Sequence, residues 1–253
     1  MIREEQWPVG EHSTVEVNVP VGVVEVHVGD AGIIQVALDS SSAAEFEISK
    51  TGDRVVVRHP SRWSIRGRSC RVNVTVPAGT DVLVEAASAD VRLSGRMGHV
   101  RIRTASGGVE TDDATRLEIS TASGDITGGA VDGNVSVSSV SGDCTLRTVG
   151  GSIDATLTSG ELRVDRCTGD ISVRSTSGDT RVGHCDGSDI SVRTISGDVR
   201  MGLPSGIRVE ADITTVSGKA SMPEPAAPSV AERRPVRVKL KTVSGDIRIV
   251  RSV

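Results

Sequence analysis

Apolar and polar residues alternate with a period of two along most of the chain. In GDISVRSTS, which begins at Gly169, Ile171 and Val173 fall on the apolar side and the residues between them on the polar side. Such alternation, with β-branched residues on the apolar side, is typical of half-buried β-strands. Because no segment sustains a period of 3.6 residues, the sequence predicts many short strands and essentially no helix.

A Ser-Gly-Asp turn motif and its variants recur through the second half of the chain. Most steps between neighbouring copies are 17 to 19 residues, and a weaker glycine series interleaves with them at about half that spacing. A strand followed by a turn therefore takes about nine residues. The motif glycines are Gly107, Gly124, Gly142, Gly160, Gly178, Gly197, Gly218 and Gly245.

Two architectures fit such a repeat, an antiparallel meander and a parallel β-solenoid. A meander has no reason to repeat its turns every 18 residues rather than every nine, whereas a solenoid stacks each residue on the one 18 positions earlier. The sequence therefore predicts an all-β parallel solenoid, β-helix-like or β-roll-like, with about 18 residues per coil. One buried ladder is expected from Val131, Val149, Cys167 and Cys185.

Four regions are expected along the chain. Residues 1–80 are less regular and hold strand patterns, so they are interpreted as an N-terminal β-rich cap continuous with the solenoid. Residues 81–222 form the regular solenoid. The segment 223–235 contains four prolines and is expected to be a mobile loop. Residues 236–253 are expected to form the terminal coil, whose last strand leaves an open edge for pairing.

Composition narrows the class of protein. Aromatic residues make up 1% of the chain and none follows Trp63, so Val, Ile, Leu and Thr are expected to fill the interior. The net charge of −4 gives no chain-wide basic field, which argues against nucleic acid or an anionic membrane as the obvious partner. Without an apolar leader or a membrane-spanning run, a cytoplasmic location and no membrane span are expected.

The acidic residues of the turn motif form the first candidate site. Stacking would place them in one column about 5 Å apart, where like charges need compensation. Ca²⁺ is one possible partner, because carboxylate oxygens suit it, although the chain lacks the paired glycines of calcium-binding β-rolls. The members of the column are Asp125, Asp143, Glu161, Asp179 and Asp198.

A basic column two residues further on offers the alternative compensation without metal. Neighbouring columns of opposite charge would neutralise one another as exposed ion pairs. Its members are Arg163, Arg181, Arg200 and Arg248. A separate basic cluster around Trp63 could bind an anion, a headgroup or RNA, or could form a solvated loop between two strands. It consists of Arg62, Arg66, Arg68 and Arg71.

Cysteine and histidine give little indication of chemistry. The four cysteines have no CxxC spacing, so neither zinc nor thioredoxin-like redox chemistry is indicated. Cys167 and Cys185 are one coil apart, which is close enough for a disulfide. Alternatively, they remain two buried thiols in the apolar ladder. His184, Cys185 and Asp186 cannot converge as a catalytic trio, because consecutive strand residues face opposite sides. No cofactor and no catalytic residue are predicted.

The chain resembles the bacterial putative-adhesin, β-strand-repeat domain family of unknown function. The resemblance rests on VPVGVVEV near the start, VPAGTDVLVEAASADVRLSG before the repeat, and TASGDITGGAVDGNVSV with its copies. It implies a β-solenoid and supplies no catalytic residues. The architecture is also similar to that of bactofilins, which polymerise end to end.

These observations favour a non-enzymatic scaffold or protein-interaction module, adhesin-like and self-associating end to end through its C-terminal edge. Two alternatives stay open. One is a module that binds Ca²⁺ or an anionic polymer on the charged ladder. The other is a polysaccharide-active enzyme, which would need convergent acid and base groups that the repeat does not suggest.

Overall fold

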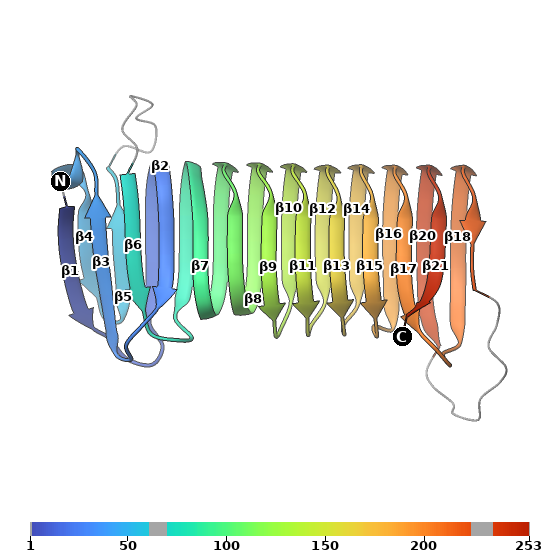
Figure 1. The fold of residues 1–253 in the computed structure, drawn as a ribbon, viewed down its shortest axis with the longest axis horizontal. Helices are drawn as coiled ribbons and strands as arrows, with labels where there is room; N and C mark the ends of the chain where they lie inside the picture. The colour runs from blue at the N-terminus through green and yellow to red at the C-terminus, as the bar shows by residue number, and fades with distance from the viewer. Residues whose placement is uncertain (1, 61–69, 224–234, 253) are drawn as a thin grey trace. The chain divides into compact units, whose positions relative to one another are not determined.

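The computed structural model describes residues 2–60, 70–223 and 235–252 (Figure 1). In these ranges the long elements are all β-strands, and the one helical turn is the 3-10 turn η1 (Ala43–Glu45). None of the described helical segments has the length and apolarity to span a bilayer. The chain divides into two compact units, unit 1 (Met1–Gly129) and unit 2 (Ala130–Val253).

Unit 1 combines an antiparallel cap with parallel coils. β1 pairs with β3, β3 with β6, and β4 with β5, all antiparallel, whereas β2 runs parallel to β5, β6 and β7. β7 and β8 then stack in parallel. Its strands are β1 (Ile2–Pro8), β2 (Thr14–Val28), β3 (Ile33–Asp39), β4 (Glu47–Thr51), β5 (Arg54–Arg58), β6 (Cys70–Val76), β7 (Asp81–Ser106), β8 (Val109–Ser123) and most of β9 (Ile126–Val131).

The first parallel coil of unit 1 comes from residues far apart in sequence. Val24 of β2 pairs with Val91 of β7, and both side chains are fully buried. The 18-residue rule therefore does not reach back to β2, because the antiparallel strands β3 to β6 lie between β2 and β7 in the sequence. Within the cap, the Phe46 ring packs edge-on against His59 at 4.8 Å between ring centroids.

Unit 2 is the regular solenoid. Two strands joined by a Ser-Gly-Asp turn make one coil, and coils stack in parallel with residues 18 or 19 apart in register. Its strands are β10 (Val135–Ser141), β11 (Cys144–Val149), β12 (Ile153–Ser159), β13 (Leu162–Cys167), β14 (Ile171–Ser177), β15 (Thr180–Cys185), β16 (Asp189–Ser196), β17 (Val199–Pro204), β18 (Val209–Ser217), β19 (Ala220–Ser221), β20 (Val236–Ser244) and β21 (Ile247–Ser252).

The predicted vertical registry is confirmed in this unit. Val149 pairs with Cys167, and Cys167 pairs with Cys185, so the expected apolar ladder forms. All three side chains have zero exposure. The fold class predicted from the sequence, an all-β parallel solenoid with about 18 residues per coil, is therefore correct.

The end of the stack differs from the prediction. β20 lies between β16 and β18, and β21 lies between β17 and β19, so the chain's last coil is the penultimate one of the stack (Figure 1). The final strand β21 is therefore not the outermost strand, although among the described residues β19 covers only its first two residues, Ile247 and Arg248. β18 is outermost instead.

The inner of these two coils is the more fully buried one. The inward residues Val238 and Leu240 of β20 are 1% and 0% exposed, whereas their β18 neighbours Ala211 and Ile213 stay exposed or half-buried. Placing the more apolar coil inside removes more hydrocarbon from water than the reverse order would.

The turn glycines are required by the stacking itself. Gly107 has φ of 121°, and a Cβ on it would lie 2.1 Å from the carbonyl oxygen of Ala89, the equivalent residue one coil earlier. The next residue, Gly108, would have its nearest neighbour at 3.8 Å. Only the first of these two glycines therefore excludes a side chain.

We expect Gly107→Ala to lower the free energy of unfolding by about 2 kcal/mol or more, because it adds backbone strain to a steric clash. Gly108→Ala, its matched control, should change stability by less than about 0.5 kcal/mol. Urea denaturation followed by circular dichroism measures both. Equal effects of the two substitutions would contradict the stacking explanation.

Candidate functional site

The acidic residues of the repeated turns act as backbone hydrogen-bond acceptors. The Asp143 Oδ1 atom accepts the Glu161 N–H at 2.8 Å, and the Asp179 Oδ1 atom accepts the Asp198 N–H at 2.8 Å. Asp198 in turn accepts the Asp246 N–H at 2.8 Å. Each carboxylate thus satisfies an amide of the next coil that the strand ladder leaves without an acceptor.

The same bond occurs at the opposite turns of the coil and in unit 1. Asn134 Oδ1 accepts the Ser152 N–H and Asp170 Oδ1 accepts the Ser188 N–H, both at 2.9 Å. In unit 1, Asp90 Oδ1 accepts the Gly108 N–H at 2.9 Å. Asn134 shows that the role needs an oxygen acceptor rather than a negative charge. The stacking supplies the amide, because the acceptor and the donor lie on neighbouring coils.

Glu161 departs from this pattern. Its longer side chain turns outward and forms ion pairs with Arg163, at 2.8 Å, and with Arg181. Arg181 also contacts Asp179 at 2.8 Å. The hydrogen bond from Arg181 is the largest of the effects that lower the pKa of Glu161, and the pKa of Arg181 is raised in return. These side chains lie at the surface, where Arg163 is exposed and the other three are partly exposed, so the pairs contribute little stability.

The predicted basic column forms, but only part of it is paired. Arg163, Arg181, Arg200 and Arg248 stack in register on successive coils. Within the described residues, Arg200 and Arg248 form no ion pair. Asp125, the remaining acid of the predicted set, lies in unit 1, in the turn between β8 and β9.

No metal centre is found in the part of the chain that the structure describes. Among residues 2–60, 70–223 and 235–252, no group of three or more His, Cys, Asp or Glu side chains is arranged to hold a metal ion. Four of the five turn carboxylates proposed for Ca²⁺, those of Asp143, Glu161, Asp179 and Asp198, already bond backbone amides or arginines.

Cys167 and Cys185 stack as fully buried free thiols. The Cys185 thiol donates to the Gly169 carbonyl oxygen at 3.7 Å, and the Cys167 sulfur lies 3.4 Å from the same oxygen. The contact between the two thiols lowers the pKa of Cys167 and raises that of Cys185. Burial raises the pKa of Cys144 to about 12. Protonated thiols of this kind behave as small apolar side chains.

His184 and Asp186 lie on the outside of the coil, away from the buried Cys185. Their side chains meet, with His184 Nε2 and Asp186 Oδ2 3.0 Å apart. His184 Nδ1 contacts the hydroxyl of Ser252 at 2.7 Å, which joins β15 to the last described strand. No sequence pattern indicates Ser252, because it is 68 residues from His184 and two coils away.

The basic cluster around Trp63 cannot be placed. Arg62, Arg66 and Arg68 lie outside the described residues, and Arg71 is an exposed residue of β6. Its role as an anion patch therefore stays a prediction.

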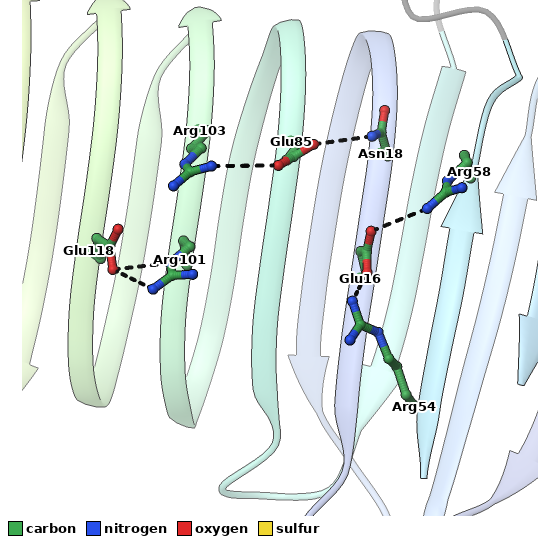
Figure 2. A network of polar contacts seen from close by, with 8 residues as sticks. All are labelled: Glu16, Asn18, Arg54, Arg58, Glu85, Arg101, Arg103 and Glu118. Carbon is green, nitrogen blue, oxygen red and sulfur yellow. Dashed lines mark hydrogen bonds and ion pairs between the residues drawn. The ribbon is translucent and has the colours of Figure 1, made fainter. Parts of the chain in front are cut away.

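Unit 1 carries an ion-pair network along its outer face that the sequence analysis missed (Figure 2). Glu16 contacts Arg54 and Arg58, and Arg101 contacts Glu118 at 2.8 Å. Glu85 accepts a hydrogen bond from the Asn18 side chain at 3.3 Å and forms an ion pair with Arg103 at 3.9 Å. The partners are 17 to 67 residues apart in sequence, so only the stacking brings them together.

A shallow polar hollow lies on the outer face of β1, β3 and β6. Amide and carboxylate side chains dominate it, and no aromatic residue offers a platform for a sugar ring. Its lining includes Glu4, Gln6, Gln35, Asn73 and Thr75.

The domain family described as Toastrack DUF4097 matches residues 12–250. No curated protein matches the chain. The predicted resemblance to a putative-adhesin, β-repeat family is confirmed.

Three solved bacterial structures illustrate what the chain is similar to. A putative lipid binding protein from Parabacteroides distasonis is 12% identical, with 100% of this chain and 96% of that chain covered and a TM-score of 0.44. A putative adhesin from Parabacteroides merdae is 9% identical over 100% and 96% of the two chains, with a TM-score of 0.37. A putative cell adhesion protein from Clostridium sporogenes is 10% identical over 99% and 100%, with a TM-score of 0.32.

If the turn carboxylates serve only as hydrogen-bond acceptors for backbone amides, Asp198→Asn should leave the free energy of unfolding nearly unchanged. Asp198→Ala, which leaves the Asp246 amide without its partner, should cost about 1 kcal/mol. Thermal unfolding of the two variants measures the difference. An Asn variant as unstable as the Ala variant would mean that the charge, rather than the bond, is required.

Because four of the five turn carboxylates already bond backbone amides or arginines, we expect Ca²⁺ not to stabilise the fold. The midpoint of thermal unfolding should be the same with excess Ca²⁺ and with a chelator, because a bound ion would raise it by mass action. A calcium-dependent rise would restore the metal hypothesis, and a Mg²⁺ titration would serve as the control for ionic strength.

Proposed function

The chain belongs to the Toastrack DUF4097 family, and from that premise we propose that it is a non-enzymatic, adhesin-like scaffold that associates end to end through β18. The partner surface is the exposed edge of the last coil of unit 2. The proposal keeps the scaffold function expected from the sequence and moves its contact from the final strand of the chain to β18.

The observation that carries this proposal is the unpaired edge of β18. Among the described strands, β18 pairs along its length with β20 alone. A strand with one free row of N–H and C=O groups is a template for another strand. β19, the second strand of this coil, spans only Ala220–Ser221 and leaves most of β21 uncovered on that side.

The interior of the last coil is also partly open. Val209 and Ile213 are half-buried and Ala211 is exposed, although all three pair with buried residues of β20 and so face the core side. A further coil would cover them. End-to-end stacking would therefore bury apolar surface as well as satisfy backbone groups.

The non-enzymatic part of the proposal is supported by how the polar residues are used. Acids and bases lie in columns along the coils, where they bond backbone amides or one another, rather than converging around one point. Acid–base catalysis needs groups positioned on a single reacting centre. The contact of His184 with Asp186 and Ser252 ties β15 to β21 and is assigned a structural role.

Binding of an anionic polymer to the charged ladder is the second candidate. Arg200 and Arg248 support it, since they stack in register and neither has an ion-pair partner within the described residues. Ca²⁺ binding has less support, because the carboxylates that would hold it are engaged with amides and arginines.

We expect the mass measured by light scattering to rise with protein concentration. Ala211→Lys should abolish the rise, because it places a charge on the open core end that a second coil must cover. Thr214→Lys adds the same charge to the outward face of the same strand and should leave association intact. A strictly monomeric wild-type protein at high concentration would rule out self-association.

A further inference from the structure

The last three coils of unit 2 expose an apolar ridge beside their Ser-Gly-Asp-type turns. Ile195, Val243 and Val216 occupy the position just before the turn of β16, β20 and β18, and are 56%, 49% and 78% exposed. The registers of these strands stack the three residues on neighbouring coils, about 4.8 Å apart.

The ridge is confined to this end of the solenoid. On the two coils before it, the equivalent residues are Thr158 and Thr176, which are polar. Val140 is apolar and 53% exposed, but it has threonine rather than an apolar residue on the next coil. Three contiguous exposed aliphatic residues therefore need an explanation that isolated ones do not.

Cations lie on both sides of this ridge. On the strand before the turn, Arg193 pairs in register with Lys241, two residues from Ile195 and Val243. Beyond the turn lie Arg200 and Arg248, stacked on successive coils, and in the outermost coil Lys219 replaces the usual turn aspartate. The ridge and these five cations together are called the basic corner.

The acids near the basic corner only partly offset its charge. Asp198 and Asp246 each accept a backbone N–H of the next coil, at 2.8 Å. Asp212 lies 3.5 Å from Lys241 and 3.9 Å from Lys239. Within the described residues, Arg193, Arg200 and Arg248 form no ion pair, so their guanidinium groups are free to bind an anion.

We propose that the basic corner is a docking surface for an anionic lipid bilayer. An aliphatic ridge that projects from a turn fits a medium into which it can insert, and cations on both sides would meet the headgroups as the ridge enters. An acidic peptide would add to the free edge of β18 through backbone groups, and this would leave Ile195 and Val243, on the two coils behind that edge, exposed. The net charge of −4 for the whole chain does not indicate this basic surface, because the cations lie together at one end of unit 2.

Vesicle sedimentation tests the proposal. The full chain should bind vesicles of phosphatidylglycerol and phosphatidylcholine, not pure phosphatidylcholine vesicles, and binding should fall as ionic strength rises. Arg193→Glu with Arg248→Glu should weaken binding at least about tenfold, since each cation near the surface contributes about a fivefold factor. Arg116→Glu with Arg166→Glu makes the same change in net charge elsewhere and should have a much smaller effect.

The ridge variants separate a membrane from a soluble polyanion. Replacing Ile195, Val216 and Val243 by Ser should also reduce vesicle binding about tenfold, whereas Val140→Ser should not. If the ridge variants bind as well as wild type, or if soluble polyglutamate binds as tightly as the vesicles do, the corner is a polyanion site and the bilayer proposal fails. Absence of binding to any vesicle would also overturn it.

The self-association variant keeps the two proposals distinguishable. Ala211→Lys lies outside the basic corner, so it should remain bound to anionic vesicles even where it no longer associates. Loss of vesicle binding in that variant would show that binding depends on assembly instead of on the corner alone. Circular dichroism of every variant checks that the solenoid stays folded.

Discussion

The structure depends on one steric constraint, the close stacking of each turn on the turn one coil earlier. A carbonyl oxygen of one coil points at the glycine Cα of the next, as at Gly178, where a Cβ would lie 2.0 Å from the Gly160 oxygen. This contact admits only glycine, fixes the backbone at positive φ, and sets the period of the repeat. Once the turns are in register, the strands between them must pair in parallel, and identical positions form ladders.

Because identical positions stack in ladders, the turn carboxylates of successive coils lie close together, and their charge must be compensated. Asp143, Asp179 and Asp198 would repel one another as free carboxylates, yet each accepts an amide hydrogen from the next coil. Arginines then complete the neutralisation where a glutamate interrupts the series, at Glu161. The repeated motif therefore mainly stabilises the stacking of the coils. Residues that could bind a partner lie where the repeat pattern changes.

Such changes gather at the C-terminal end of unit 2. The coil formed by β20 and β21 is inserted between two coils that precede it in sequence, and the less apolar coil of β18 and β19 is left outside. The same three coils carry the ridge residues Ile195, Val216 and Val243 and the unpaired arginines. An open edge and an amphipathic corner therefore arise at one end, whereas the regular coils before it are closed by their own ladders.

The sequence by itself determined the fold class, the coil length and the apolar ladder through Val149, Cys167 and Cys185, because a period of 18 admits one register. It also located the acidic and basic columns. Only the tertiary structure decided which coil ends the stack, since burial, not chain order, selects the outermost coil. The sequence also does not predict the contact of His184 with Ser252 or the cluster of cations around the ridge. Both bring together coils that are not consecutive in the sequence.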